Sequence, residues 1–269
     1  MSRKAFHARL WTLVYGPCLW AISLSVTAQT AAPHTLALCY ENAEIHPWRL
    51  QNHQGLNFDL LRLAADKLRL QLEFRGLPWK RCLAEVQARR VHGAFAVSFN
   101  PARLDVGAFP GGTSPDFSKR MHVDRYVLVK RKGSALQWNG KSFVGLDGAV
   151  GVQLGYSIGD HLRGLGVDVD DGSPGPSALL DKLLAGRIQA AALGGSDAER
   201  LVSTNEGAAA HLEILTPALI EKPYFLMLSH EFVRLHPQLA QRLWGAIEEI
   251  RQSPGYQKIQ AQRMAEQAR

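Results

Sequence analysis

Hydrophobic and polar positions in the first part of the chain switch between the periods of strands and helices. Residues 35–40, 71–75 and 91–97 predict strands, while residues 58–68 and a segment from about residue 78 predict amphipathic helices. Strands that alternate with helices build a mostly parallel sheet with helices packed on it. The pattern therefore predicts an α/β fold for this part of the chain.

A second α/β unit is predicted beyond residues 107–124, where the periodicity gives way to Gly, Pro, Ser and charged residues. The later segments alternate again, with strands expected at 126–130, 149–153, 188–193 and 224–228, and helices from 157 and at 178–185. Residues 230–269 are mostly helical in pattern. We therefore expect two lobes.

Polar side chains gather where the third predicted strand ends. Asn100 and Pro101 suit the N-cap and first turn of a helix, which places Ser98 at the end of the strand and Arg103 in the first helical turn. This edge of an α/β sheet is where ligands bind, and a helix N-terminus favours anions. Because the helix dipole disfavours a cation there, Arg103 needs an anion, either a bound carboxylate or a surface acid such as Asp105.

The first 28 residues have the pattern of a secretory signal peptide, with a basic start, an apolar centre and small residues at the end. Cleavage would start the mature chain near Gln29. A retained membrane anchor is the alternative, which the length of the apolar segment only just permits. No other stretch is apolar enough to span a bilayer, so we expect an exported protein, periplasmic in a bacterium.

The net charge changes this picture little. The chain carries +7, but three basic residues and no acid lie in residues 1–28, which leaves +4 for residues 29–269. Basic residues are scattered, so we expect no nucleic-acid partner. The histidines lack the spacing of metal ligands, so we expect no metal and no cofactor: His46, His92, His122 and His161.

Two cysteines, Cys39 and Cys82, remain after the predicted signal peptide. An oxidising compartment favours one disulfide between them, and their places at the end of a strand and the start of a helix make contact plausible. Two free buried thiols are the alternative.

Seven segments, taken in order and spacing, resemble the family 3 periplasmic solute-binding proteins, whose best-known members capture polar amino acids for ABC importers. They are LALCYENAEIHPW, GLNFDLLRLAADKL, LPWKRCLAEVQ, FAVSFNPAR, VGVQLGYSIGDHL, LLAGRIQAAALGG and KPYFLMLS. The resemblance implies two α/β lobes, each a mostly parallel sheet flanked by helices, joined by two crossings that act as a hinge. Residues 29–124 and 230–269 would form the first lobe, and residues 125–229 the second.

The resemblance also implies ligand-binding residues in the first lobe. Glu41 stands where related proteins have an acid that meets the ligand's ammonium, although exposed loop acids are common. Trp48 and Trp79 each follow a proline near the same edge, where a flat ring can cover a small molecule. Core packing explains either tryptophan equally well.

In the second lobe, Gly155, Tyr156 and Ser157 follow a predicted strand and open a helix. Ser157 and Asp160 form a capping-box pattern, which would account for both residues without a ligand. Free N–H groups at that helix start could instead bind the anionic end of a ligand held by Arg103 and Ser98. Family members usually have a small hydroxyl residue where Tyr156 stands, so its ring should reshape the pocket.

Two further departures bear on the ligand. Amino-acid binders commonly place an aspartate at the position of Gly194, where it pairs with the α-ammonium, and many relatives have a serine at the position of Ala96. Asp197 or Glu41 could replace the missing aspartate. Alternatively the ligand has no α-ammonium, since a buried charge without a partner is costly.

The sequence therefore predicts a monomeric periplasmic protein that captures a small carboxylate-bearing molecule between two lobes for an ABC permease. One alternative is a periplasmic enzyme of the same fold, similar to a dehydratase, with Glu41 or Asp197 as its only candidate acid or base. The other is an adaptor that presents its ligand to a membrane signalling receptor.

Overall fold

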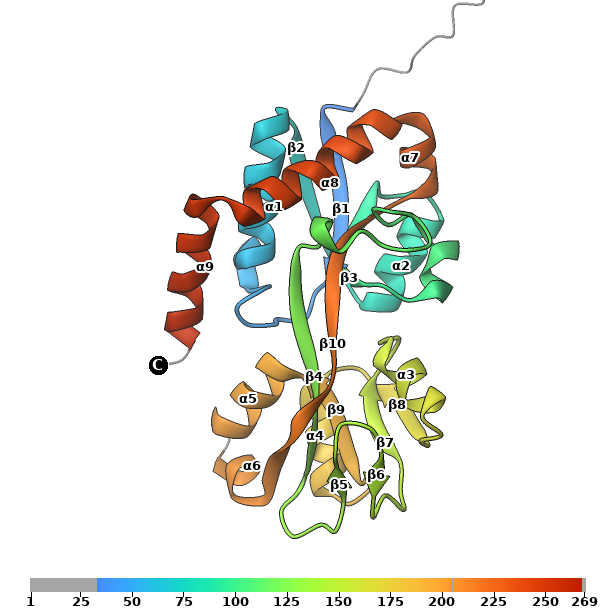
Figure 1. Cartoon of the computed structure of the whole chain (residues 1–269), viewed down its shortest axis with the longest axis vertical. Helices are drawn as coiled ribbons and strands as arrows, with labels where there is room; N and C mark the ends of the chain where they lie inside the picture. Colours follow the sequence, from blue (N-terminus) through green and yellow to red (C-terminus); the bar gives the residue numbers. More distant parts are fainter. Residues whose placement is uncertain (1–32, 205, 268–269) are drawn as a thin grey trace, which may run out of the picture. The chain divides into compact units, whose positions relative to one another are not determined.

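The computed structural model describes residues 33–204 and 206–267; the predicted signal peptide lies outside them. The first lobe contains strands β1 (Thr35–Glu41), β2 (Gln71–Leu77) and β3 (Gly93–Ser98), and helices α1 (Leu56–Leu68) and α2 (Trp79–Gln87). The chain returns to it at the end through α7 (His230–Leu235), α8 (Pro237–Gln252) and α9 (Pro254–Gln267). Helix α8 packs on α1, so the two ends of the described chain share one lobe (Figure 1).

The second lobe is built from the middle of the chain. Its elements are strands β7 (Val150–Gln153), β8 (Val169–Ser173) and β9 (Ala190–Gly194), the short pair β5 (Gln137–Trp138) and β6 (Phe143–Val144), and helices α3 (Ile158–Gly164), α4 (Pro176–Leu184), α5 (Gly195–Thr204) and α6 (Glu206–His211). Within each lobe the neighbouring strands β1, β2 and β3, and β7, β8 and β9, pair in parallel. This order confirms the predicted α/β class.

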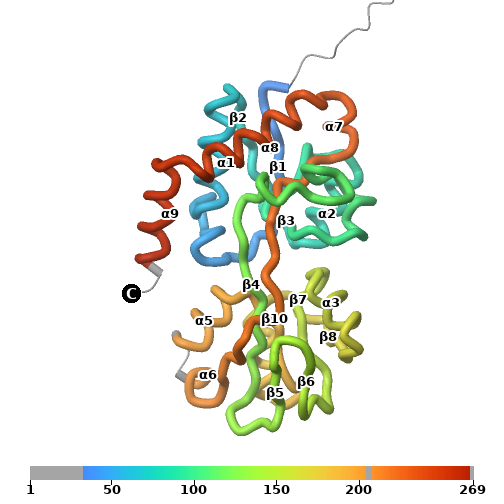
Figure 2. Tube along the Cα trace, in the orientation of Figure 1, coloured from blue at the N-terminus to red at the C-terminus, as the bar shows by residue number. Residues whose placement is uncertain are grey.

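Two long strands, β4 (His122–Arg131) and β10 (Leu212–Leu228), run from one lobe into the other (Figures 1 and 2). They pair antiparallel with each other, β10 also pairs with β3, and β4 also pairs with β9. One sheet results, in the order β2-β1-β3-β10-β4-β9-β7-β8. These are the two predicted crossings, and both strands are longer than the sequence pattern indicated.

The buried apolar side chains separate into sets that follow the lobes. Those of the first lobe come from residues 36–121 and 225–256, and those of the second from residues 126–219. Trp244 belongs to the first core and Trp138 to the second. Burial of each set explains why each lobe holds together as a unit.

The helix predicted after Asn100 is confirmed only as a short 3-10 helix, with Asn100 as its N-cap and Pro101 in its first turn. Pro101–Asp105 form only a five-residue 3-10 turn, although the Asn100 side chain does accept a hydrogen bond from the Ala102 N–H over 3.0 Å. The apolar spacing needed for a longer amphipathic helix stops at Gly107, where the chain enters a loop. The argument from a helix dipole at Arg103 therefore does not apply, and its position must be judged from its contacts.

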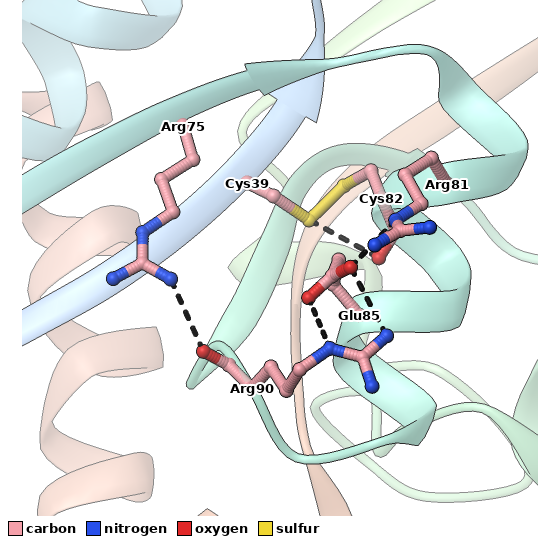
Figure 3. Close-up of a disulfide and its surroundings, with 6 residues drawn as sticks. All are labelled: Cys39, Arg75, Arg81, Cys82, Glu85 and Arg90. Carbon is pink, nitrogen blue, oxygen red and sulfur yellow. Dashed lines mark hydrogen bonds and ion pairs between the residues drawn. A yellow bond between two sulfur atoms is a disulfide. The ribbon is translucent and has the colours of Figure 1, made fainter.

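The predicted disulfide between Cys39 and Cys82 is confirmed and joins the end of β1 to the first turn of α2 (Figure 3). One turn further along α2, Glu85 accepts hydrogen bonds from Arg90 over 3.0 Å and from Arg81 over 2.6 Å. Hydrogen bonds from Arg90, aided by Arg81, lower the pKa of Glu85 to about 2. The bridge holds α2 against β1, while the ion pairs lie within α2 and the loop after it. The end of β1 and the start of α2 lie at the same edge of the sheet, at the pocket.

Replacing both bridging cysteines with alanine should lower the free energy of unfolding. The bond closes a loop across 43 residues, and the chain-entropy cost of such a loop predicts a loss of about 4 kcal/mol. Urea unfolding of the ligand-free mature protein measures it. A reductant should shift the wild-type midpoint and leave the double variant unchanged; equal midpoints for the oxidised proteins would contradict the prediction.

Candidate ligand-binding site

A pocket of about 480 Å³, partly open to solvent, lies between the lobes. Seven residues predicted from the sequence line it: Glu41, Trp48, Trp79, Ser98, Arg103, Tyr156 and Ser157. Six others that matter for its chemistry were not predicted: Arg49, Asn57, His122, Asp124, Tyr126 and Tyr224. The first-lobe side chains come from the end of β1, the loop between β1 and α1, the starts of α1 and α2, the end of β3 and the 3-10 helix that follows β3. The others come from the loop after β7 and from the crossing strands.

Arg103 is a buried cation with only neutral hydrogen-bond partners. Its guanidinium donates to the Ser98 carbonyl over 2.7 Å, to Ser98 Oγ over 2.8 Å and to the Gly155 carbonyl over 3.3 Å. The ring of Trp79 lies 5.3 Å from the guanidinium carbon. Burial lowers the pKa of Arg103. Since no carboxylate pairs with it in residues 33–204 and 206–267, Asp105 included, the charge faces the pocket without a counter-ion.

Ser157 does not cap α3, so the capping-box prediction is wrong. Its backbone is already helical, with φ −68° and ψ −6°, and its side chain makes no capping hydrogen bond. Ser157 Oγ instead lies 2.9 Å from Ser98 Oγ and accepts from Lys222 Nζ over 3.0 Å. Burial, and then Arg103, lower the pKa of Lys222 to about 8. The hydroxyl is therefore part of a group of donors at the lobe boundary.

The two lobes touch at the rim of this group. Asn100 Nδ2 of the first lobe donates to Asp160 Oδ2 of the second over 2.7 Å. Gly155 has φ +79°, a conformation that other residues rarely adopt, and a Cβ added there would lie 3.1 Å from Lys80 Cγ. A glycine at this turn thus permits the close approach of the second lobe to α2.

Glu41 is already paired within the protein. Its Oε2 accepts a hydrogen bond from Arg49 over 2.9 Å and another from the Tyr156 hydroxyl. Glu41 is 7% exposed and Arg49 4%, so this is a buried ion pair. Burial, and then the Glu41 charge, raise the pKa of Tyr156 well above its ordinary value, so its hydroxyl stays a donor. Because Arg49 already neutralises the Glu41 carboxylate, Glu41 should attract a ligand ammonium less strongly.

Three aromatic rings stack along one wall. The His122 ring lies 4.1 Å from the Trp48 ring and 4.8 Å from the Tyr224 ring, with interplanar angles of 18° and 3°. Burial, and then the nearby charge of Arg49, lower the pKa of His122 to about 3, so it is neutral at pH 7. From the sequence, His122 was considered only as a possible metal ligand, and so this position was missed.

Asp124 supplies a carboxylate to the pocket. Its Oδ1 accepts the Arg125 N–H over 2.8 Å, and it forms no ion pair with any described residue. Burial raises its pKa to about 6. A Cβ added at Gly194 would lie 3.5 Å from Asp124 Oδ2, so this carboxylate lies beside the position where the resemblance expects an aspartate.

Asp197 lies outside the pocket lining. It is 2% exposed on α5, and its Oδ1 has no hydrogen-bond partner in the described part of the chain, with Arg200 NH2 4.0 Å away. Burial raises its pKa to about 7. The structure therefore offers Asp124, rather than Asp197, as the acid next to Gly194.

A strand pattern could have revealed part of what the sequence interpretation missed. His122, Asp124 and Tyr126 alternate on β4 and all line the pocket, but the segment up to residue 124 looked irregular because Gly, Pro and charged residues precede it. Arg49 lies in the loop before α1, and Asn57 lies in the first turn of α1. No spacing in the sequence singles them out.

The model of the bacterial extracellular solute-binding proteins, family 3, matches residues 40–265, and the chain belongs to this family. The members of this family are described as solute-binding proteins. Comparison with the curated proteins finds no significant match. In the described ranges no helix is both long and apolar enough to cross a membrane.

Solved structures with the same fold include binding proteins and a sensor. An ancestral arginine-binding protein bound to arginine is 21% identical over 86% of this chain and 99% of that one, with a TM-score of 0.68. The substrate-binding protein of an amino acid ABC transporter is 17% identical over 83% and 96%, with a TM-score of 0.62. A histidine kinase sensor domain similar to periplasmic binding proteins is 17% identical over 85% and 95%, with a TM-score of 0.67.

Replacing Asp197 with asparagine should make stability less dependent on pH. Because its pKa is about 7 in the folded protein and ordinarily 3.8, the folded carboxyl keeps its proton between these values while the unfolded one loses it. Its contribution to stability therefore falls as pH rises through this window. Between pH 5 and pH 8, the free energy of unfolding of the variant should rise by roughly 2–3 kcal/mol relative to that of the wild type.

Urea unfolding of the ligand-free proteins at both pH values measures this gain. Asp147→Asn, at an exposed position, is the matched control and should differ from the wild type by the same amount at each pH. A constant gap for the Asp197 variant would show that this carboxyl is ionised throughout.

Proposed function

We propose that the protein captures a small carboxylate-bearing ligand, an amino acid or a related compound, between its lobes and delivers it to an ABC permease. The observation that supports this most directly is Arg103, a buried guanidinium that faces the pocket with neutral partners only. A buried charge without a counter-ion is costly. A ligand carboxylate would provide that counter-ion, and the planar guanidinium suits it because two parallel hydrogen bonds can form.

The surrounding donors favour the same ligand group. The hydroxyls of Ser98 and Ser157 come from opposite lobes, and Lys222 already donates to Ser157. A carboxylate placed among them would accept hydrogen bonds from both lobes at once. Binding would then favour the closed arrangement of the lobes, with β4 and β10 as the hinge.

Asp124 supports an ammonium on the same ligand. Its carboxylate faces the pocket without an ion pair to any described residue, whereas Glu41 is paired with Arg49. We therefore propose that Asp124 takes the part that the resemblance assigns to an aspartate at Gly194. A ligand with both a carboxylate and an ammonium would match Arg103 and Asp124 together.

We further propose that residues 1–28 are removed on export and that the mature protein acts as a periplasmic monomer. Its lobes would be residues 29–124 with 230–269, and residues 125–229. The similarity to a histidine kinase sensor domain favours a second candidate, in which the loaded protein presents its ligand to a membrane receptor. Binding of a permease or of a receptor by the loaded protein would separate the two functions.

Replacing Arg103 with alanine should abolish ligand binding and leave the fold intact. A thermal-shift screen of the mature protein against amino acids, amides, organic acids and polyamines identifies a ligand first. At about a hundred times its Kd, a ligand adds about 2.7 kcal/mol, which shifts Tm by several degrees. Affinity of the Arg103 variant, measured by calorimetry, should fall by at least about 100-fold.

Arg75→Ala is the matched control, because this arginine pairs with Glu73 on the surface outside the pocket. It should bind as the wild type does. Retained affinity in the Arg103 variant, or hits confined to compounds without a carboxylate, would refute the proposed role of Arg103.

Replacing Asp124 with asparagine should lower the affinity for ammonium-bearing ligands by at least about 30-fold. The same ligand without its amino group should bind both proteins equally. Because Gly194 lies beside this carboxylate, the exchange Asp124→Gly with Gly194→Asp should restore most of the lost affinity. If the ammonium-bearing ligand binds the Asp124 variant normally, another group holds the ammonium.

A further inference from the structure

One part of the pocket contains buried polar atoms that lack hydrogen-bond partners. Among the buried side chains of the described residues these include Trp48 Nε1, both amide atoms of Asn57 and His122 Nδ1. The three residues are 6%, 1% and 7% exposed, and all line the pocket. We name them the inner subsite.

The three residues adjoin one another. The Asn57 N–H donates to the Trp48 carbonyl over 3.0 Å, which places the first turn of α1 against the loop that holds Trp48. The Trp48 ring in turn stacks on His122 at 4.1 Å. Unpaired polar atoms are usually rare in a folded protein, and here several gather at one cavity.

The unpaired atoms require both kinds of hydrogen-bond partner. The indole N–H of Trp48 can only donate, so it needs an acceptor. Asn57 has both kinds of group, because its Oδ1 accepts hydrogen bonds and its Nδ2 donates them. A group that satisfies this set must itself accept and donate hydrogen bonds.

The charges around the inner subsite favour an uncharged group. Arg49 is the cation whose charge reaches His122, and it is paired with Glu41 at 2.9 Å. A cationic ligand group would face Arg49, while an anionic one would leave Asn57 Oδ1 without a donor. An apolar group would leave all of these atoms unpaired, which is the costly outcome for buried polar atoms.

We propose that the inner subsite binds a carboxamide group of the ligand, which accepts from Trp48 and Asn57 and donates to Asn57. This assignment rests on the proposed function, because it places the carboxamide at the other end of a molecule whose carboxylate meets Arg103. The ligand class is then a small amino acid amide of the glutamine or asparagine type. Asn57 is the residue that sets the preference.

Calorimetry with glutamine, asparagine, glutamate, methionine and arginine tests the ligand class. At least one of the two carboxamides should bind at least about 100-fold more tightly than glutamate, methionine and arginine, because those ligands leave buried groups unpaired or bring a charge. If glutamate, methionine or arginine bound as tightly as the carboxamides, the assignment of the inner subsite would be wrong. The proposed carboxylate-binding function would still stand. Absence of binding by every carboxylate would overturn both.

Asn57→Leu provides the second, independent measurement. Leucine is close to asparagine in size and has no polar atoms, so the ligand-free variant should have a Tm equal to or higher than that of the wild type. Its affinity for the carboxamide should fall by about 100-fold, and its preference over methionine should disappear. A lower Tm with unchanged selectivity would show that Asn57 has a structural role only.

Ser173→Ala is the matched control for this variant. Ser173 Oγ is likewise buried and unpartnered within the described chain, but it lies on β8 outside the pocket lining. Its replacement should leave affinity and selectivity unchanged. A loss of selectivity in both variants would attribute the effect to general loosening and overturn the role of Asn57.

Discussion

The antiparallel pairing of β4 and β10 is the interaction on which both the fold and the pocket depend. It joins two lobes that otherwise have separate apolar cores into one sheet of eight strands. The same strands also form a pocket wall, because His122, Asp124 and Tyr126 alternate on β4 and Tyr224 lies opposite His122 on β10. Any movement of one lobe relative to the other must bend these strands, so it also moves the binding groups.

The charges in the pocket follow a simple division. Arg49 and Glu41 neutralise each other inside the wall, while Arg103 and Asp124 face the cavity with opposite signs and without ion-pair partners in the described chain. In a poorly solvated cavity, charges interact more strongly than in water. A molecule with both a negative and a positive group would therefore gain at two points, whereas a molecule with one charge would leave the other group uncompensated.

Local sequence signals predicted the fold well because strand and helix periods and the two cysteines are properties of short segments. They predicted Arg103 and Ser98 at the pocket for the same reason, since both follow directly from the end of a strand. Asp124 was missed because its proposed role depends on Gly194, which is distant in sequence and comes close only through the pairing of β4 with β9. The capping box at Ser157 was wrong because its hydroxyl finds stronger tertiary partners, a competition that sequence spacing does not reveal.

The unpaired groups also relate stability to binding. In the ligand-free protein Arg103 and the inner subsite are buried and Asp124 is partly buried, all without full compensation, and each lowers the stability of the free fold. A ligand that pairs with these groups would offset their cost. These groups lie on the first lobe and on β4, whereas Ser157 and Lys222 bring donors from the second lobe and β10 to the position next to Ser98. A ligand carboxylate at Arg103 would therefore meet groups of both lobes, and the free energy released by pairing that carboxylate would also favour closure.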